Sequence, residues 1–232
     1  MAQRSESLAA GLGVDGHREV HLADQAAFDR ALAALLTLDD RLPPLAALTG
    51  PLTLRRRAPD FAGLTAVVVA QQLSVAAARA ISARLDTALG GPPTVETLLA
   101  ADVADLRAAG LSAGKVRTLT GIARALADGT VDLAAVETME ADAAAAYLTR
   151  LPGIGLWTAD IYLLFCLGRS DAFPHGDLAL QVAAGDAFGL PGRATAIGLA
   201  AIAEDWRPYR GVAAQLLWAY YGVRRARLGA PT

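Results

Sequence analysis

The feature that most constrains this chain is the stretch Leu151-Pro152-Gly153-Ile154-Gly155, a hairpin signal between two helical patterns. Pro152 disfavours helical geometry at the residue before it, and the two glycines allow a tight turn with positive φ and close approach of another backbone. The helix expected after the hairpin begins with amides that have no partner within the helix, at the positive end of its dipole. Such amides bind anions, so a phosphate can lie directly on Gly153 and Gly155.

The patterns on either side of this hairpin are helical. The upstream pattern, 138–150, contains four consecutive alanines, and alanine has the highest helix propensity. The downstream pattern, 157–167, is almost wholly apolar and stops at Gly168, a residue suited to the position after a helix. An ordinary turn between two helices would use the same Pro-Gly dipeptide, so the hairpin alone leaves that alternative open.

The composition predicts an all-α protein. The 232 residues suffice for one large domain or two small lobes that bury most of their apolar surface. The hydrophobic content of 54% is rich in alanine, whereas β-branched and aromatic runs are scarce. No apolar run reaches membrane-spanning length and the N-terminus lacks a signal-peptide core, so we expect a cytoplasmic protein without a membrane partner.

Cysteine usage and charge exclude further classes. The single cysteine, Cys166, excludes an internal disulfide and a four-cysteine iron–sulfur cluster, and its apolar surroundings predict a small core residue. The net charge of −2 argues against a protein that coats nucleic acid by bulk electrostatics. It permits a protein that uses a few phosphate sites lined by amides. The basic cluster Arg55-Arg56-Arg57 is either a solvated loop or such a phosphate contact.

Helix signals recur along the chain and describe a compact bundle of short helices. Residues 1–20 are small, polar and dotted with glycine, so we expect a frayed tail. The apolar spacing over 60–89 predicts one long helix, in which Gln71, Gln72 and Ser74 are more polar than a surface position requires and favour a functional role. Other helices are expected after the caps Asp24, Thr94, Asp102 and Ser112, and over 178–188, 194–204 and 211–228.

Three motifs together resemble the helix-hairpin-helix/Gly-Pro-Asp (HhH-GPD) superfamily of DNA base-excision glycosylases. The pattern LPGIGxWTA, followed 26 residues after its leucine by Asp177, resembles the 3-methyladenine-DNA glycosylase II (AlkA-like) branch. VAQQLS at 69–74 and LRAAGLS at 106–112, the latter followed by Lys115 and Arg117, resemble two further family segments. DWRPYR at 205–210 is similar to the family's W-x-P-(W/Y)-R stretch, so the resemblance covers about 60–221.

The resemblance implies an HhH-GPD fold with two helical lobes that flank a cleft. Lobe one would span about 62–150, and lobe two about 21–60 together with 158–232, with the hairpin 151–157 between them. This would be a compact form that lacks the N-terminal β-domain of longer relatives. The implied partner is double-stranded DNA that contains alkylated bases, bound by a monomer in the cytoplasm at the nucleoid.

The resemblance also implies the chemistry. Asp177 would be the catalytic carboxylate, which stabilises the positive charge on the sugar of an extruded nucleotide as the glycosidic bond breaks. From its sequence context, Asp177 can equally cap the helix expected from Leu178. The other implied roles are a substrate pocket from Trp157 and Trp218, a DNA plug from Gln72, and phosphate contacts from Gly153, Gly155 and Thr158. Trp218 can equally be a core anchor of the last helix.

Position 157 predicts the outcome of the reaction. In relatives that also cut the DNA backbone, a lysine at this place forms a Schiff base with the sugar, whereas this chain has Trp157. The expected activity is therefore monofunctional, releasing alkylated purines such as 3-methyladenine and leaving an abasic site without lyase activity. No cofactor is expected, although relatives often hold a monovalent cation at carbonyls that correspond to Leu151 and Ile154. His175 is not required by the motif and is expected to be a solvent-facing loop residue.

Two alternative functions stay open. One is an HhH-GPD glycosylase that acts on oxidised or deaminated bases. The other is a non-catalytic helix-hairpin-helix DNA-binding module, which would explain Gly153 and Gly155. That module would leave Asp177, Trp157 and the paired glutamines without a function.

Overall fold

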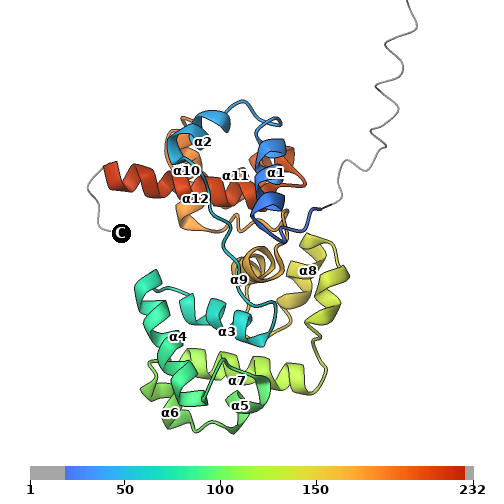
Figure 1. The fold of residues 1–232 in the computed structure, drawn as a ribbon, viewed down its shortest axis with the longest axis vertical. Helices are drawn as coiled ribbons and strands as arrows, with labels where there is room; N and C mark the ends of the chain where they lie inside the picture. The colour runs from blue at the N-terminus through green and yellow to red at the C-terminus, as the bar shows by residue number, and fades with distance from the viewer. Residues whose placement is uncertain (1–18, 228–232) are drawn as a thin grey trace, which may run out of the picture.

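The computed structural model describes residues 19–227, and within this range the secondary structure is helical, with one isolated bridge between His21 and Arg169. Figure 1 shows two groups of helices with α8 (Ala141–Leu148) and α9 (Leu156–Tyr162) between them. The upper lobe consists of α1 (Gln25–Leu35), α2 (Pro43–Thr49), α10 (Leu178–Ala187), α11 (Ala196–Ala203) and α12 (Arg210–Arg227). The lower lobe consists of α3 (Phe61–Ala70), α4 (Val75–Leu89), α5 (Val95–Ala100), α6 (Val103–Ala108) and α7 (Ala113–Ala127). The predicted all-α fold with two lobes is confirmed.

Three short segments complete the helical structure: η1 (Ala134–Thr138), the π-helical η2 (Leu163–Leu167) and η3 (Glu204–Trp206). None of the helices in the described part of the chain has both the length and the apolar character to cross a bilayer.

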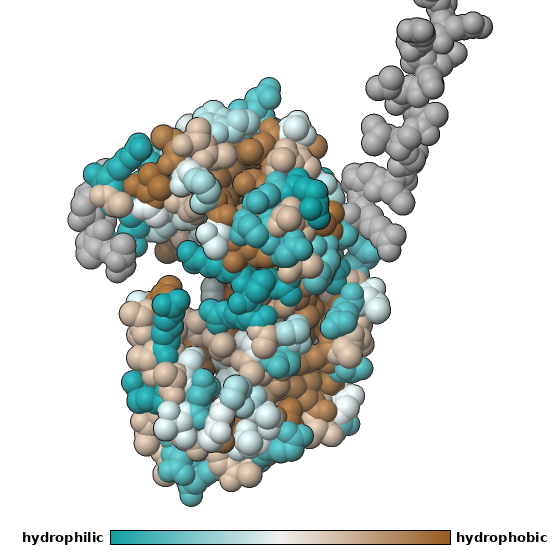
Figure 2. Space-filling view, viewed as in Figure 1, coloured by the Kyte–Doolittle hydropathy of each residue, from teal (hydrophilic) through white to brown (hydrophobic). Residues whose placement is uncertain are grey.

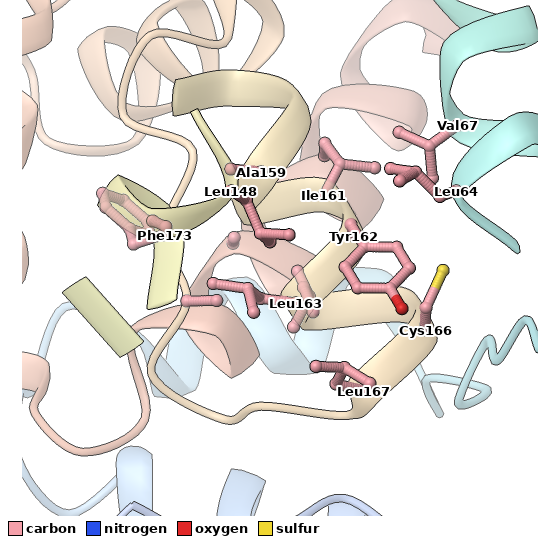
Figure 3. Close-up of a cluster of buried hydrophobic side chains, with 14 of the residues drawn as sticks. Leu64, Val67, Leu148, Ala159, Ile161, Tyr162, Leu163, Cys166, Leu167 and Phe173 are labelled. Carbon is pink, nitrogen blue, oxygen red and sulfur yellow. The ribbon is translucent and has the colours of Figure 1, made fainter. Parts of the chain in front are cut away.

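The core is built around α9 and its continuation. The helix runs on as η2 and ends at Gly168, whose φ of 69° is left-handed, as expected for a residue that closes a helix. In Figure 3, Tyr162 and Leu163 lie among Leu64 of α3 and Leu148 of α8, within one buried cluster. This packing holds the hairpin, at the start of α9, against the lower lobe.

Cys166 lies in the same cluster and is fully buried, which confirms its predicted place in the core. Burial raises the pKa of its thiol to about 12. The thiol therefore stays protonated and inert at neutral pH.

Polar caps predicted from the sequence begin several helices. The side chains of Asp24, Thr94, Asp102 and Ser112 each accept a hydrogen bond from a first-turn amide of the helix that follows. A cap of this kind stabilises a helix by about 1 kcal/mol, so these starts are determined locally.

The single long helix predicted over 60–89 is wrong. α3 ends at Ala70, and α4 begins at Val75 after a turn of residues 71–74. Gln72 has a φ of 58°, and the Ser74 hydroxyl accepts the Ala77 amide as the cap of α4. Neither glycine nor proline marks this break, and Ser74, a favoured N-cap residue, is the one local signal for it.

The expected tail falls outside the described residues as far as residue 18. Its last two predicted members, Glu19 and Val20, are held in place, which contradicts that part of the prediction. The Val20 amide donates to the Ser170 hydroxyl at 2.9 Å, and the Glu19 carboxylate forms an ion pair with Arg169.

The basic cluster contributes to the same region. The Arg56 guanidinium donates to the carbonyls of Leu22 at 2.5 Å and of Cys166 at 3.0 Å, whereas Arg55 and Arg57 are exposed. Arg56 therefore joins the N-terminal segment to the end of the central helix.

A network of charges connects α8 to the upper lobe. Asp171, which is 4% exposed, accepts from Arg207 at 2.6 Å and from Arg210 at 2.8 Å. Asp142 of α8 accepts from the same two arginines at 2.6 and 2.8 Å. Because Arg210 begins α12, these contacts fix α8 relative to that helix.

Asp160 of α9 lies within the electrostatic reach of this network and is 8% exposed. Burial raises the pKa of its carboxyl from 3.8 to about 7; Arg210 opposes this rise and Asp142 adds to it. Since the pKa is higher in the folded than in the unfolded protein, the folded state binds an extra proton between these two pH values. Stability from this group is therefore largest at low pH and is lost as the pH rises through 7.

We predict that the free energy of unfolding of the wild type falls by roughly 3 kcal/mol between pH 5 and pH 8, and that Asp160→Asn removes most of this fall. Urea denaturation at pH 5, 6, 7 and 8 measures it. Asp142 titrates below this window, because its ion pairs with Arg207 and Arg210 lower its pKa more than burial raises it. Equal pH dependence in variant and wild type would contradict the assignment to Asp160.

Candidate active site

A cleft of about 580 Å³ opens between the two lobes. Figure 2 shows the surface indented between them. The turn 71–74, the start of α9 and the start of α10 supply the lining, which consists of Gln71, Gln72, Trp157, Thr158, Gly176, Asp177 and Leu178. Three segments that are distant in sequence thus bring Gln72, Trp157 and Asp177 to one place.

Asp177 is held in one orientation by three N–H donors. Its Oδ1 accepts the Leu180 amide at 3.0 Å and the Trp218 Nε1 at 3.1 Å, and its Oδ2 accepts the Trp157 Nε1 at 2.9 Å. The bond from Leu180 makes Asp177 the N-cap of α10. The side chain is half-buried and lines the cleft, so the cap and the cleft-facing carboxylate are one residue.

The negative charge of Asp177 is not neutralised by a cationic side chain. Within residues 19–227, no arginine, lysine or histidine forms an ion pair with it. The dipoles of three N–H groups solvate the carboxylate without cancelling its charge. The arrangement can therefore stabilise positive charge that develops nearby, at no cost of reorganisation.

The two tryptophans reach Asp177 from different helices. Trp157 is the second residue of α9, and Trp218 lies in the middle of α12, where its ring stacks on Phe165 with centroids 5.8 Å apart. Both are half-buried. The sequence analysis predicted that the two aromatic side chains line a substrate pocket. The structure adds that both indole N–H groups donate to the Asp177 carboxylate. Trp218 is thus more than a core anchor, because it also orients Asp177.

The side chains of Gln71 and Gln72 lie in different surroundings. The Gln71 side-chain amide donates to the Thr158 hydroxyl at 2.9 Å, whereas Gln72 is exposed at the cleft. Thr158 is 4% exposed, and its hydroxyl is engaged by Gln71. This contact joins α9 to the turn 71–74. The phosphate contact of Thr158 stays a prediction, and its main-chain amide in the first turn of α9 is open to such an acceptor.

The hairpin uses its two glycines differently. The Ile154 amide donates to the Leu151 carbonyl at 3.2 Å, which closes a turn in which Gly153 has a φ of 73°. A Cβ on Gly153 would overlap the Thr118 side chain of α7, so packing also requires glycine there. Gly155 has a φ of −93°, so the positive φ that the two glycines allow is used at Gly153, and a Cβ on Gly155 would meet nothing within 4 Å.

Gly155 is exposed and supplies no side chain to cap α9, so the first amides of the helix stay open to an external acceptor. Packing among the described residues does not require glycine at this position. Glycine is a favoured residue at a helix N-cap, and it also leaves room for the close approach of a ligand.

The hairpin rests on α7 through a contact that the sequence did not reveal. A Cβ on Gly121 would lie 2.7 Å from the Pro152 ring, so the ring sits directly on the α7 backbone. The only sign of this contact in the sequence is that Gly121 is small and lies about one helical turn after Thr118. Nothing distinguishes Gly121 from an ordinary glycine in a helix.

The monovalent cation expected at the carbonyls of Leu151 and Ile154 stays a prediction. The Leu151 carbonyl uses one lone pair in the turn and keeps a second. Among the residues that the structure describes, no group of three or more His, Cys, Asp or Glu side chains is placed to hold a metal ion.

His175 shapes the loop before Asp177 through its main chain. Its amide donates to the Phe173 carbonyl at 2.8 Å, and its carbonyl accepts the Gln181 side-chain amide at 3.1 Å. The residue is half-buried rather than fully solvent-facing.

The chain is similar in sequence to known DNA repair proteins. A probable bifunctional transcriptional activator/DNA repair enzyme AlkA of Mycobacterium tuberculosis is 35% identical over 163 residues, which are 65% of this chain and 31% of that protein. The chain thus spans less than a third of that relative.

Two solved structures superpose over most of the chain. The DNA-3-methyladenine glycosidase of Bacillus halodurans has a TM-score of 0.75 at 29% identity, over 90% of this chain and 94% of that one. The 3-methyladenine DNA glycosylase Mag1 of Schizosaccharomyces pombe, in complex with abasic DNA, has a TM-score of 0.73 at 31% identity, over 82% of this chain and 95% of that one.

The model of the HhH-GPD superfamily base excision DNA repair proteins matches residues 65–208. This match covers more than half of the chain and includes both the hairpin and Asp177. The chain therefore belongs to the HhH-GPD superfamily of base excision DNA repair proteins.

Proposed function

We propose that this protein is a monofunctional DNA glycosylase that releases alkylated purines, such as 3-methyladenine, from duplex DNA and leaves an abasic site. The observation that carries the proposal is Asp177, a carboxylate that three N–H donors aim into an interlobe cleft and that has no cationic partner among residues 19–227. Relatives named as 3-methyladenine glycosylases support alkylated bases as the substrate class. The protein acts as a monomer on double-stranded DNA.

The cleft suits an extruded nucleotide. A glycosylase cannot reach the bond between sugar and base inside a duplex, so the nucleotide must first leave the stack. The cleft volume of about 580 Å³ lies within the range of pockets that enclose small ligands. Gln72, exposed at the cleft, is then the side chain that fills the vacated space in the duplex.

Asp177 supplies the chemistry. Bond breaking leaves positive charge on the deoxyribose, and a fixed carboxylate beside the sugar stabilises that charge in the transition state. The lone pair that stays free on Oδ2 can also orient, or accept a proton from, the water that attacks C1′. The hydrogen bonds from Trp157 and Trp218 prevent the side chain from turning away from the sugar.

Trp157 contributes to selectivity for alkylated bases. A purine methylated at ring nitrogen N3 is cationic while it is bonded to the sugar, and an indole face attracts a cation by about 0.5–2 kcal/mol, depending on desolvation. Cationic lesions also have weakened glycosidic bonds. A loosely shaped pocket can therefore select them through the quality of the leaving group.

The lysine content supports the proposed absence of lyase activity. Lys115 is the only lysine in the sequence, and its ammonium is engaged by the carbonyls of Val69 and Gln71. Position 157 in the hairpin motif holds tryptophan. No lysine is therefore placed to attack the sugar carbon and form a Schiff base.

The hairpin offers a matched pair of variants for its phosphate contact. We predict that Gly155→Ala loses at most about 1 kcal/mol of stability, because alanine is a weaker N-cap than glycine. It should bind duplex DNA about tenfold more weakly, because a methyl group obstructs a charge-assisted contact with phosphate. Gly153→Ala should instead lower the melting temperature, since φ there is positive and Thr118 occupies the space. Fluorescence anisotropy and thermal unfolding measure the two effects, and wild-type affinity in Gly155→Ala would contradict the phosphate contact.

Base release tests the proposed function directly. Duplexes that each carry one alkylated purine are incubated with the protein, released bases are identified by chromatography, and strand cleavage is compared before and after mild alkali. Base release with cleavage only after alkali supports the proposal. Cleavage without alkali would show lyase activity, release confined to oxidised or deaminated bases would show another specificity, and binding without release would show a non-catalytic module.

A further inference from the structure

Lys115, in the first turn of α7, binds the main chain where α3 ends. Its Nζ donates to the Val69 carbonyl at 2.6 Å and to the Gln71 carbonyl at 3.0 Å. Carbonyls at the end of a helix lack partners within the helix, and a cation suits the negative end of the dipole. The ammonium thus takes the place of the next helical turn, which α3 does not form.

The turn held by Lys115 is strained. Gln72 has a φ of 58°, and it is the one residue other than glycine with positive φ in the described part of the chain. Such a conformation persists only where its surroundings impose it. Two contacts do so here: Lys115 holds the main chain from α7, and the Gln71 side chain is bound to Thr158 of α9.

We infer that Lys115 is a positioning residue, which holds the turn 71–74 so that Gln72 stands at the cleft and fills the space left by an extruded nucleotide. The inference rests on the proposed function. Lys115 belongs to the segment after Ser112 that resembles the family, and the chemistry at Asp177 gives this segment no role. The inference gives it one.

The inference separates two steps of the reaction. Lys115 has no hydrogen bond to Asp177, Trp157 or Trp218, so its loss leaves the carboxylate and its donors in place. Without the ammonium, the two carbonyls lose their partner and Gln72 relaxes toward ordinary backbone angles. The defect should therefore affect the extrusion of a paired base and spare the breaking of the glycosidic bond.

The first experiment compares Lys115→Met and Lys115→Arg with the wild type in single-turnover base release. The substrate is DNA with one alkylated purine, either paired in a duplex or in a single strand. In a single strand, extrusion of the base leaves no gap in a duplex for Gln72 to fill. Lys115→Met should be about tenfold slower on the duplex, as expected for losing a hydrogen-bonding charge, and should stay near wild-type on the single strand. Lys115→Arg should restore the duplex rate. Equal losses on both substrates, or no loss on the duplex, would overturn the inference.

The second experiment is a double-mutant cycle with Gln72→Ala. If Lys115 acts through Gln72, the double variant should be no slower on duplex DNA than Gln72→Ala alone. Independent, multiplied losses would show that Lys115 acts elsewhere.

A binding assay keeps the inference separate from the proposed activity. A duplex with a tetrahydrofuran abasic analogue opposite 2-aminopurine reports insertion of a side chain as a change in fluorescence, without any base release. Lys115→Met should lose most of this change and Lys115→Arg should keep it; an unchanged signal in Lys115→Met would refute the role. If the wild type releases no base, the proposed function fails. The fluorescence assay still decides the role of Lys115 in that case, because it does not depend on base release. If Lys115→Met does not fold by circular dichroism, Lys115→Gln replaces it with the same expected direction.

Discussion

Asp177→Asn will bind DNA that carries an alkylated purine or an abasic analogue, but will release the base at least about 10²–10³-fold more slowly than the wild type. The variant removes the charge that stabilises the sugar cation and keeps the size of the side chain. Asparagine caps helices as well as aspartate does, so α10 should keep its cap and the variant should stay folded. Single-turnover base release, fluorescence anisotropy and thermal unfolding measure the three quantities.

Asp177→Asn also changes the hydrogen bonds at this position. Asparagine can present its oxygen to Leu180 and Trp218, but its NH₂ group then faces the Trp157 Nε1, which is also a donor. Trp157→Phe is therefore the matched control, because it removes that N–H and keeps the charge. We expect Trp157→Phe to lose about tenfold, far less than Asp177→Asn. Wild-type base release by Asp177→Asn would show that another group carries the reaction.

Asp171→Asn will lower the free energy of unfolding by about 3–5 kcal/mol, as expected when one partner of a buried ion pair is removed. Asp171 is 4% exposed and pairs with Arg210, which is 6% exposed, as well as with Arg207. The variant leaves the Arg210 charge buried with less compensation. Urea denaturation at pH 7 measures the loss.

The chain offers a matched control for this prediction. Asp186 pairs with Arg224 at 2.7 Å, but the two side chains are 39% and 41% exposed, so water screens their attraction. Asp186→Asn should lower stability much less than Asp171→Asn. Equal losses in the two variants would mean that the network joining α8 to α12 adds little to stability.

The features predictable from the sequence are those that depend on a few neighbouring residues. Pro152 and Gly153 specify their turn through their own backbone preferences, Gly168 closes the central helix, and caps such as Asp24 bind amides only three residues away. The family resemblance extended this local information to the site, because the hairpin and Asp177 recur at a fixed spacing. The pattern therefore indicated the cleft residues before their geometry was visible.

The turn 71–74 shows where sequence reasoning fails. Residues 60–89 read as one helix, because the break contains neither glycine nor proline and each residue in it tolerates a helix. The break is set by Lys115 and Thr158, which lie 44 and 87 residues away from Gln71 along the chain. Contacts over such distances leave no periodic signal in the segment that they reshape.

By itself, the sequence determined the all-α class, several helix caps and the hairpin, since each depends on residues close together in the chain, and the family resemblance singled out the carboxylate 26 residues after Leu151. Only the tertiary structure decided how that carboxylate is oriented, because its indole donors lie 20 and 41 residues away. It also decided that the Thr158 hydroxyl binds Gln71, and that burial moves the pKa of Asp160 to about 7. Hydrogen-bond geometry and desolvation depend on which helices pack together, and packing is a property of the whole fold.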